Sequence, residues 1–311
     1  MTSTYANTVL LIRNPIAGRR RQGLVAAVVR QLEAEGWAVE MVDTAAAGDA
    51  RRLAESHEVD RYAVIAVAGG DGTINEVVNG LAARGDSAPP LAIVPLGTAN
   101  VLAHELGLAA KASAVAKTIT SGRAMLVHPG QASCVSGPDG DTRCFSLMAG
   151  AGFDAKVVAG VSAPLKRRLG KAAYVWRSLI ETRRYRPVRY AVEIDGASYE
   201  AASVIVTHSR HYAGPYVVAP NALLSEPLLH VCLFERWGRR QTLRFGVALL
   251  LGRLPLTGGY RVITGRQIRV SVLCDAGERR RQPVQIDGDD ALTLPVSIGL
   301  ARAAVRLLQP A

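Results

Sequence analysis

A glycine-rich loop that carries one acid, Gly69-Gly70-Asp71-Gly72-Thr73, is the strongest chemical signal in the sequence. An apolar run typical of a β-strand, Ala63–Val67, precedes the loop, and apolar residues at helical spacing follow it. Glycines let backbone amides approach a phosphate, and the positive end of a helix dipole favours the anion. A carboxylate beside phosphates needs a divalent cation between them or a proton to accept. The loop therefore predicts a phosphate site at which Asp71 either meets a divalent cation such as Mg²⁺ or accepts a proton.

The residues after the loop predict a helix from Thr73 to Arg84. Thr73 and Glu76 have the spacing of a capping box, which is typical of a helix N-terminus. The alternative is that GGDG forms only a tight turn between a strand and a helix. The capping box and the acid together favour a functional loop over that alternative.

Two further loops follow predicted strands in the same way. The first, Asn14–Gly18 (NPIAG), comes after the strand Thr8–Arg13 and is followed by three arginines, Arg19–Arg21. The second, Pro95–Asn100 (PLGTAN), comes after the strand Leu91–Val94, and we expect Asn100 to cap the next helix and Thr98 to hydrogen-bond a phosphate. Taken alone, NPIAG is better explained as an ordinary turn and PLGTAN is explained equally well as one, but three such loops are less easily dismissed.

The elements that carry these loops alternate in type over residues 1–125. Strand–helix alternation with short connections predicts an α/β domain with a doubly wound, mostly parallel sheet. In such sheets ligands bind beyond the carboxyl ends of the strands, which is where all three loops are expected. The remaining predicted elements of this domain are a strand at Ala38–Val42 and helices at Gln22–Glu35, Gly48–His57, Asn100–Leu106 and Ser113–Ser121.

From Arg123 onward short β-type runs predominate, which predicts a mainly β second domain, a sandwich over residues 126–295. The remaining residues, 296–311, form a C-terminal segment that can return to the first domain. Two helices interrupt the strands, a basic amphipathic one at Lys171–Arg184 and a more hydrophobic one at Arg239–Leu251. We interpret the first chiefly as a packed helix with a solvated basic face, with a membrane-facing element as the lesser alternative.

Composition narrows the classes of partner. The chain has 311 residues, 49% of them hydrophobic, and a net charge of +11. Only 5% of residues are aromatic and no nucleic-acid motif is present, so we expect no nucleic acid and favour an anionic membrane surface or a phosphate-rich ligand. No apolar run reaches the roughly 20 residues of a membrane span. The four scattered cysteines suit a reducing cytosol. We therefore expect a cytoplasmic protein, peripherally associated with the inner face of the membrane.

The three loops, in the order NPxAG, GGDGTxNEVxNGL and PLGTxN, resemble the diacylglycerol kinase/sphingosine kinase catalytic family. NAD kinases share the middle motif but not the flanking pair. The resemblance implies that the loops hold ATP with Mg²⁺ and that a threonine after the second strand, here Thr44, touches the nucleotide. The nucleotide-binding residues implied in this way are Asn14, Pro15, Ile16, Ala17, Gly18, Thr44, Gly69, Gly70, Gly72, Thr73, Asn75, Glu76, Gly97, Thr98 and Asn100.

The resemblance continues, more loosely, into the second half. Ala149–Ala155 resembles a GxGxDA segment without its preceding asparagine, and Tyr212–Pro220 resembles a YxGG…P stretch. Asp287-Gly288-Asp289 matches the position of a DGE motif, whose glutamate is thought to be the general base, so Asp289 is the candidate base. Its side chain is one methylene shorter, and Asp290 is a neighbour that could compensate. The alternative is an acidic hairpin turn, because Asp-Gly is a strong turn signal.

A second departure lies at Leu223–His230. Many bacterial members hold a structural magnesium in a DDGxLD-like run, and here Glu226 is the only acid left in that run. One carboxylate is too few for a tight Mg²⁺ cage, so we expect the structural metal to be absent or weakly held.

These observations together predict an ATP-dependent lipid kinase that phosphorylates the hydroxyl of diacylglycerol or a related lipid alcohol at the membrane surface. Two alternatives remain open. One is an NAD kinase-like phosphotransferase, and the other is a non-catalytic lipid- or nucleotide-binding relative. A homodimer is also left open.

Overall fold

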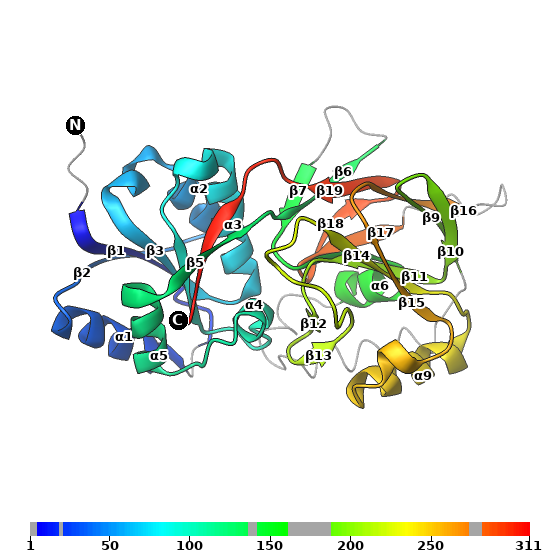
Figure 1. The fold of residues 1–311 in the computed structure, drawn as a ribbon, viewed down its shortest axis with the longest axis horizontal. Helices are drawn as coiled ribbons and strands as arrows, with labels where there is room; N and C mark the ends of the chain where they lie inside the picture. Colours follow the sequence, from blue (N-terminus) through cyan, green and yellow to red (C-terminus); the bar gives the residue numbers. More distant parts are fainter. Residues whose placement is uncertain (1–4, 19–20, 136–141, 161–187, 274–281) are drawn as a thin grey trace. The chain divides into compact units, whose positions relative to one another are not determined.

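The computed structural model describes residues 5–18, 21–135, 142–160, 188–273 and 282–311. By its internal contacts the chain divides into two units (Figure 1). The first unit comprises residues 1–129 with 301–311, and the second comprises residues 130–300. The predicted helix at Lys171–Arg184 lies outside the described residues.

The first unit is built on a six-stranded sheet in the order β2-β1-β3-β4-β20-β5. Every neighbouring pair is parallel except β20 with β5. The strands are β1 (Tyr5–Arg13), β2 (Ala38–Asp43), β3 (Tyr62–Gly69), β4 (Leu91–Pro95), β5 (Arg123–Val127) and β20 (Val305–Gln309). The central strands β3 and β4 are buried along almost their whole length, as parallel strands covered on both faces are.

Helices cover both faces of this sheet. In Figure 1, α1 packs beside α5 on one face and α2 packs beside α3 on the other. The helices are α1 (Gln22–Ala34), α2 (Asp49–Glu55), α3 (Asp71–Arg84), α4 (Val101–Glu105) and α5 (Ala112–Ser121), with the 3-10 helices η2 (His57–Arg61) and η3 (Gly85–Ser87). The predicted α/β class of this domain is confirmed.

The start of α3 differs from the capping-box prediction, which is wrong. The helix begins at Asp71, and the carbonyl of Gly70 accepts its first backbone hydrogen bond from the Ile74 amide at 3.0 Å. Thr73 and Glu76 therefore lie inside the helix, where they bond to other elements instead of capping it. The Glu76 carboxylate accepts a hydrogen bond from the Ala50 amide of α2 at 3.2 Å, and so ties α2 to α3.

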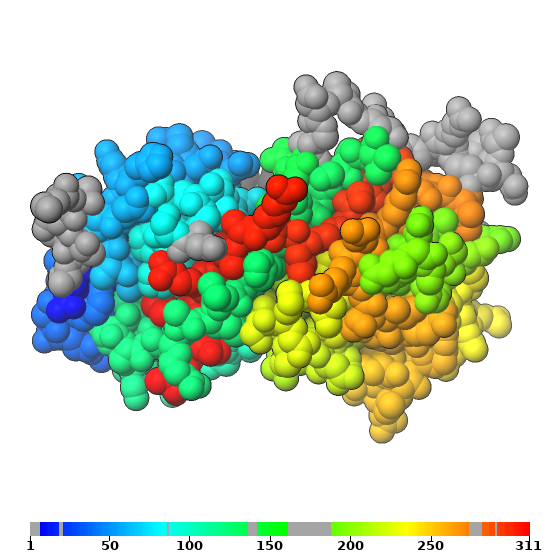
Figure 2. Space-filling view, turned by 45° about the horizontal axis from the view of Figure 1, so that its top comes forward, coloured from blue at the N-terminus to red at the C-terminus, as the bar shows by residue number. Residues whose placement is uncertain are grey.

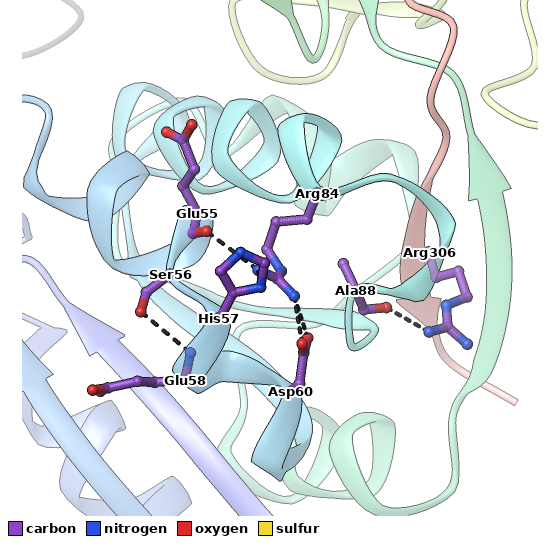
Figure 3. Close-up of polar contacts among 8 residues, drawn as sticks. All are labelled: Glu55, Ser56, His57, Glu58, Asp60, Arg84, Ala88 and Arg306. Atoms are coloured by element: carbon purple, nitrogen blue, oxygen red, sulfur yellow. Dashed lines mark hydrogen bonds and ion pairs between the residues drawn. The ribbon is translucent and has the colours of Figure 1, made fainter. Parts of the chain in front are cut away.

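The far end of α3 is fixed by a buried arginine (Figure 3). The guanidinium of Arg84 bonds both carboxylate oxygens of Asp60, at 2.6 and 2.5 Å, and lies 3.0 Å from Nδ1 of His57. Because only 5% of the Arg84 side chain is exposed, this ion pair is better shielded from water than a surface pair. Helix α3 is thus held at its C-terminal end while its N-terminal end faces the three loops.

The C-terminal segment completes the first sheet. Strand β20 lies between β4 and β5, and Arg306 donates a hydrogen bond to the carbonyl of Ala88 (Figure 3). The first of the β-type runs expected from Arg123 onward therefore belongs to this sheet as β5, because β20 pairs with it. Of the segment 296–311, the strand β19 (Val296–Leu300) stays with the second unit and β20 returns to the first.

The second unit is a β-sandwich, as predicted. Its two six-stranded sheets have the orders β10-β9-β16-β19-β6-β7 and β15-β14-β11-β8-β17-β18, and β12-β13 forms a separate hairpin. The strands are β6 (Gly130–Cys134), β7 (Thr142–Phe145), β8 (Met148–Ala151), β9 (Arg189–Ile194), β10 (Ala197–Ala201), β11 (Ser203–Thr207), β12 (His211–Tyr212), β13 (Tyr216–Val217), β14 (Leu229–Phe234), β15 (Tyr260–Gly265), β16 (Ile268–Leu273), β17 (Pro283–Ile286), β18 (Asp289–Thr293) and β19.

One apolar core lies between the two sheets. It joins inward side chains of β9 and β16 from one sheet with those of β11 and β14 from the other. Alternating burial along β9 is the pattern expected when one face of a strand is packed. Within the described residues of this unit, two helices, α6 (Phe153–Ala159) and α9 (Arg239–Leu250), and the 3-10 helix η4 (Leu254–Leu256) accompany the sandwich.

Candidate nucleotide-binding and catalytic sites

The three predicted loops of the first unit meet. Nδ2 of Asn14, at the end of β1, donates to Oγ1 of Thr73 on α3 at 2.9 Å. The backbone amides of Leu96 and Gly97 donate to the carbonyl of Gly69 at 3.0 and 3.2 Å. In chain order the loops are Asn14–Gly18, Gly69–Thr73 and Pro95–Asn100, called here the first, second and third. The second loop is therefore bonded to both of the others, at the carboxyl edge of the sheet.

Two glycines are required for this close approach. A methyl group added at Gly18 would lie 2.1 Å from the carbonyl oxygen of Leu96, and Gly18 also has a φ of 54°. A methyl group added at Gly97 would lie 2.7 Å from Cα of Gly70. Because a Cβ at either position would separate the loops, these contacts explain the glycine of NPIAG and the glycine of PLGTAN.

The N-terminus of α3 opens onto this junction. Its N-cap residue is Gly70, and no side chain caps the first turn. The first amides of a helix of this length have no partners within the helix, so they offer donors to an anion. Asn14 contributes a fixed turn beside them, since its side-chain oxygen accepts the amides of Ile16 and Ala17 at 3.1 and 3.2 Å.

Asp71 caps the helix α4, the role predicted for Asn100, and that prediction is wrong. Oδ1 of Asp71 accepts the Val101 amide at 2.8 Å, whereas Asn100 makes no side-chain capping bond. Burial raises the pKa of Asp71, and the amides of Val101, Leu102 and Asn100 oppose that rise. The residue is half-buried, so the carboxylate is held in a defined orientation at the edge of the loop cluster.

Asn100 is buried in a left-handed conformation with a φ of 48°. Within the described residues its Oδ1 has no hydrogen-bond partner, and a methyl group added at Gly97 would lie 2.7 Å from that oxygen. Asn100 therefore folds back over the third loop, next to Gly97.

The other nucleotide-binding candidates separate into two groups. Thr98 is exposed at the third loop, and Thr44 follows β2 with its amide bonded to the Arg13 carbonyl at 2.9 Å. Asn75 and Glu76 bond elsewhere: Asn75 accepts a hydrogen bond from Asn79 at 3.0 Å, and Glu76 holds α2.

The arginines that follow the first loop are only partly described. Arg19 and Arg20 lie outside the described residues. Arg21 is exposed and donates from its guanidinium to the carbonyl of Gly97 at 3.3 Å, so it lies beside the third loop.

The loop cluster fits a nucleoside triphosphate that brings Mg²⁺ with it. It offers uncapped amides of α3, glycines without Cβ atoms and one carboxylate, Asp71. No group of three or more His, Cys, Asp or Glu side chains gathers anywhere in the described ranges. Proteins commonly bind Mg²⁺ through one or two carboxylates together with substrate phosphates, so a single aspartate suffices here.

The candidate base of the second unit lies on a tight hairpin between β17 and β18. Asp287 and Gly288 have φ values of 48° and 86°, which are the left-handed conformations of a type I′ turn. Asp289 begins β18 and is exposed. The turn alternative and the base alternative are therefore compatible, because different residues of the same motif would perform the two roles.

Asp287 fixes this hairpin to the sandwich, a role that sequence reasoning missed. Oδ2 accepts the amide and hydroxyl of Ser146, both at 2.7 Å, and Oδ1 accepts the amides of Leu147 and Met148 at 3.0 and 2.8 Å. Burial raises the pKa of Asp287 to about 6, against these four hydrogen bonds, which favour the charged form. The hairpin therefore has little freedom to move relative to β8.

A second buried contact reaches the same hairpin from the GxGxDA segment. Oε1 of Gln285 accepts the Gly288 amide at 2.8 Å, and the Gln285 side chain also lies beside the carboxylate of Asp154. The hydroxyl of Tyr212 donates to Asp154, whose pKa is raised by burial. A methyl group added at Gly150 would lie 2.8 Å from Asp154 Oδ2 and 2.9 Å from Gln285 Nε2. The two loosely matched motifs are thus joined to the candidate base through Gln285.

Glu226 lies on an exposed turn, where its amide donates to the Leu223 carbonyl at 3.1 Å. Its charge raises the pKa of His230, but burial has the larger, lowering effect on that imidazole. The weak or absent structural metal at this run stays a prediction.

Replacing Asp287 by asparagine is expected to lower the free energy of unfolding by about 2–4 kcal/mol, because an amide NH₂ would face two of the four donors. The matched control is Asp195→Asn. Asp195-Gly196 forms the same turn, with φ values of 48° and 89°, but it is exposed and Asp195 accepts amides of only Arg266 and Gln267. Urea denaturation should therefore give a control effect below about 1 kcal/mol. Equal effects of the two substitutions would contradict the anchoring role of Asp287.

The described chain thus combines an α/β unit that carries a phosphate-type loop cluster with a β-sandwich unit. The family model of the diacylglycerol kinase catalytic domain matches residues 8–132. The model of the YegS C-terminal NAD kinase β-sandwich-like domain matches residues 148–309. The protein belongs to this diacylglycerol kinase family of lipid kinases, and it is a phosphotransferase.

Individual relatives agree with that assignment. Diacylglycerol kinase of Bacillus subtilis (strain 168) is 30% identical over 246 residues, 78% of each chain. Lipid kinase YegS of Escherichia coli (strain K12) is 29% identical over 206 residues, 65% of this chain and 67% of the relative.

Solved structures support the fold. A diacylglycerol kinase from Bacillus anthracis str. Sterne superposes with a TM-score of 0.70 at 22% identity, covering 99% of this chain and 98% of that one. Yeast NADH kinase complexed with NADH superposes with a TM-score of 0.50 at 11% identity, covering 98% and 84%. At such identities the likeness concerns the fold alone.

Proposed function

We propose that this kinase transfers the γ-phosphoryl group of ATP to the free hydroxyl of diacylglycerol or a related lipid alcohol. The single observation that carries the proposal is the junction of three loops at the uncapped N-terminus of α3, with Asp71 at its edge. Phosphoryl transfer needs positioning and charge neutralisation more than covalent help, and backbone amides with one carboxylate supply them.

In the first unit, the amides of the α3 N-terminus bind the phosphates and the loop glycines let the chain approach them closely. Asp71 holds the metal side of the nucleotide, with its orientation set by the bond from the Val101 amide. Mg²⁺, when bound with ATP, neutralises charge on the β- and γ-phosphates. Thr98 and Thr44 are placed after strand ends of the same sheet and contribute polar contacts to the nucleotide.

In the second unit, Asp289 accepts the proton of the lipid hydroxyl. At the same time the hydroxyl oxygen of the lipid forms a bond to the γ-phosphorus, and the bond between that phosphorus and ADP breaks. The position of Asp289 supports this role. It is exposed at the first residue of β18, while the preceding Asp287 and Gly288 are held by Ser146 and Gln285. A base on a rigid turn loses little entropy on reaching its substrate.

The decisive experiment incubates the protein with labelled ATP and Mg²⁺ and a panel of acceptors: diacylglycerol, monoacylglycerol, ceramide, sphingosine and NAD. We expect labelled phosphate in the organic phase with diacylglycerol or a related lipid alcohol, and none on NAD. Label on NAD without label on any lipid would instead favour an NAD kinase-like phosphotransferase, and nucleotide binding without any product would favour a non-catalytic relative.

The lipid acceptor also bears on where the protein works. No described helix has both the length and the apolar character to cross a membrane. We expect the kinase to bind its lipid substrate at the surface of the inner leaflet of the membrane.

A further inference from the structure

The helix α9 and the turn after it carry an unusual concentration of exposed apolar side chains. Across the described ranges, eleven large hydrophobic side chains are exposed, and five of them lie between residues 243 and 256. These five are Leu243 at 58%, Val247 at 47%, Leu250 at 63%, Leu251 at 66% and Leu256 at 87% exposed. Scattered single apolar residues are ordinary on a protein surface, but five within fourteen residues form a patch.

The patch is not needed to pack α9. Leu243, Val247 and Leu250 recur at helical spacing on one face of the helix. The opposite face packs on the sandwich through Phe245 and Ala248, and the ring of Phe245 lies 5.2 Å from that of Phe234. Figure 1 shows α9 in gold at the margin of the second unit, and Figure 2 shows gold surface along the lower edge of that unit.

Arginines surround this apolar face. Arg239, Arg240, Arg244 and Arg253 are exposed, and no acidic residue occurs from position 236 to 260. Among the described side chains, no ion pair is formed by any of these four. Two of them lie in the first turn of α9, where a cation opposes the helix dipole and so does not stabilise the helix.

We propose that this face of α9 and η4, the α9 surface, docks onto an anionic lipid bilayer. A helix with leucines on one face and arginines beside them lies in the plane of a membrane, with its apolar side chains at the boundary between headgroups and acyl chains. The guanidinium groups then reach lipid phosphates in bidentate contacts. With 12 residues α9 is about 18 Å long, which suits an in-plane helix.

Charge selects the bilayer over a second copy of the chain. Pairing two α9 surfaces would bring eight arginines together without an acid from the same segments, which is repulsive. An anionic membrane has both the apolar layer for the leucines and the negative charge for the arginines. The inference rests on residues outside the loop cluster and the hairpin, so it stands independently of the proposed reaction.

The test is flotation of the full chain with vesicles, without nucleotide or turnover. Vesicles of phosphatidylcholine with about 30% phosphatidylglycerol, an anionic lipid, are compared with pure phosphatidylcholine vesicles. We expect the parent to float with the anionic vesicles. The pair Leu250→Ser with Leu251→Ser should reduce partitioning by at least about tenfold, and Arg240→Gln with Arg244→Gln by about fivefold for each charge removed.

Matched controls are Met41→Ser, an exposed apolar residue of β2, and Arg30→Gln, an exposed arginine of α1. Both controls should float like the parent, and circular dichroism should show all variants folded. Equal flotation of the leucine pair and the parent would overturn the proposal, as would equal binding to neutral and anionic vesicles. A vesicle-free dimer that the leucine pair dissociates would identify a second copy as the occupant instead.

Discussion

Replacing Asp71 by asparagine is expected to lower kcat/KM for phosphoryl transfer by about a hundredfold or more, with little loss of stability. The asparagine oxygen can still accept the Val101 amide, so α4 remains capped, but the negative charge that would hold the metal side of the nucleotide is gone. The rate should then require a higher concentration of Mg²⁺ for half-saturation. Asp71→Ala should show the same loss of rate together with about 1 kcal/mol of destabilisation, because it also removes the cap.

The matched control for this prediction is Asp49→Asn. Asp49 is also an aspartate of the first unit that accepts backbone amides, those of Ala45 and Ala46 at 2.9 and 3.0 Å. It follows β2 instead of the loop junction, so its rate and Mg²⁺ dependence should match the parent. If Asp71→Asn retained both the parental rate and the parental Mg²⁺ dependence, Asp71 would be a helix cap and nothing more.

The meeting of the three loops could be predicted from the sequence because one rule governs all of them. Parallel strands in a doubly wound sheet have their carboxyl ends at one edge, and each motif directly follows an apolar run of strand type. The rule predicts that the three loops lie near one another, but it does not predict which of their residues touch. It could not show that Gly18 lies against Leu96, or that Gly97 lies against Gly70, because those approaches depend on how far each loop bends.

The capping assignments failed for a related reason. A threonine followed by a glutamate three residues later has the spacing of a capping box whether it begins a helix or lies one turn inside it. In this chain, partners from other elements determine these contacts. Asn14 donates a hydrogen bond to the Thr73 hydroxyl, and the Ala50 amide donates one to the Glu76 carboxylate. The Asp71 carboxylate accepts the first amide of α4. Local propensity cannot reveal a competitor that comes from elsewhere in the chain.

The anchoring of the β17–β18 hairpin could not be predicted from the sequence either, because its partners also lie far away in the chain. Asp287 bonds residues 146–148, and it reaches them because β17 pairs with β8 in a fixed register, with Gln285 opposite Gly150. Sequence indicated an Asp-Gly turn there, and the turn exists. The register between strands that are so far apart in sequence is set by the packed core, so the partner of the first aspartate could not be derived from the motif.

Because the hairpin is anchored through Asp287, substitution of Asp289 tests the role of that carboxylate without displacing the turn. Asp289→Ala is expected to reduce kcat with the lipid acceptor by about 10²–10⁴-fold while leaving nucleotide binding unchanged, since a general base typically contributes that much. Asp289→Glu restores a carboxylate that is displaced by about 1 Å, so it should recover activity to within about tenfold of the parent.

The neighbouring aspartate provides the discriminating control for this last prediction. Asp290→Ala should retain the parental rate if Asp289 is the base, whereas the opposite pattern would transfer the role to Asp290. Parental rates in both single variants and in the double variant would remove the hairpin from the chemistry. Because Asp287 is left untouched in all of these variants, its bonds to Ser146 and Met148 keep the turn in place. A change in rate would then report on the base itself instead of on a displaced hairpin.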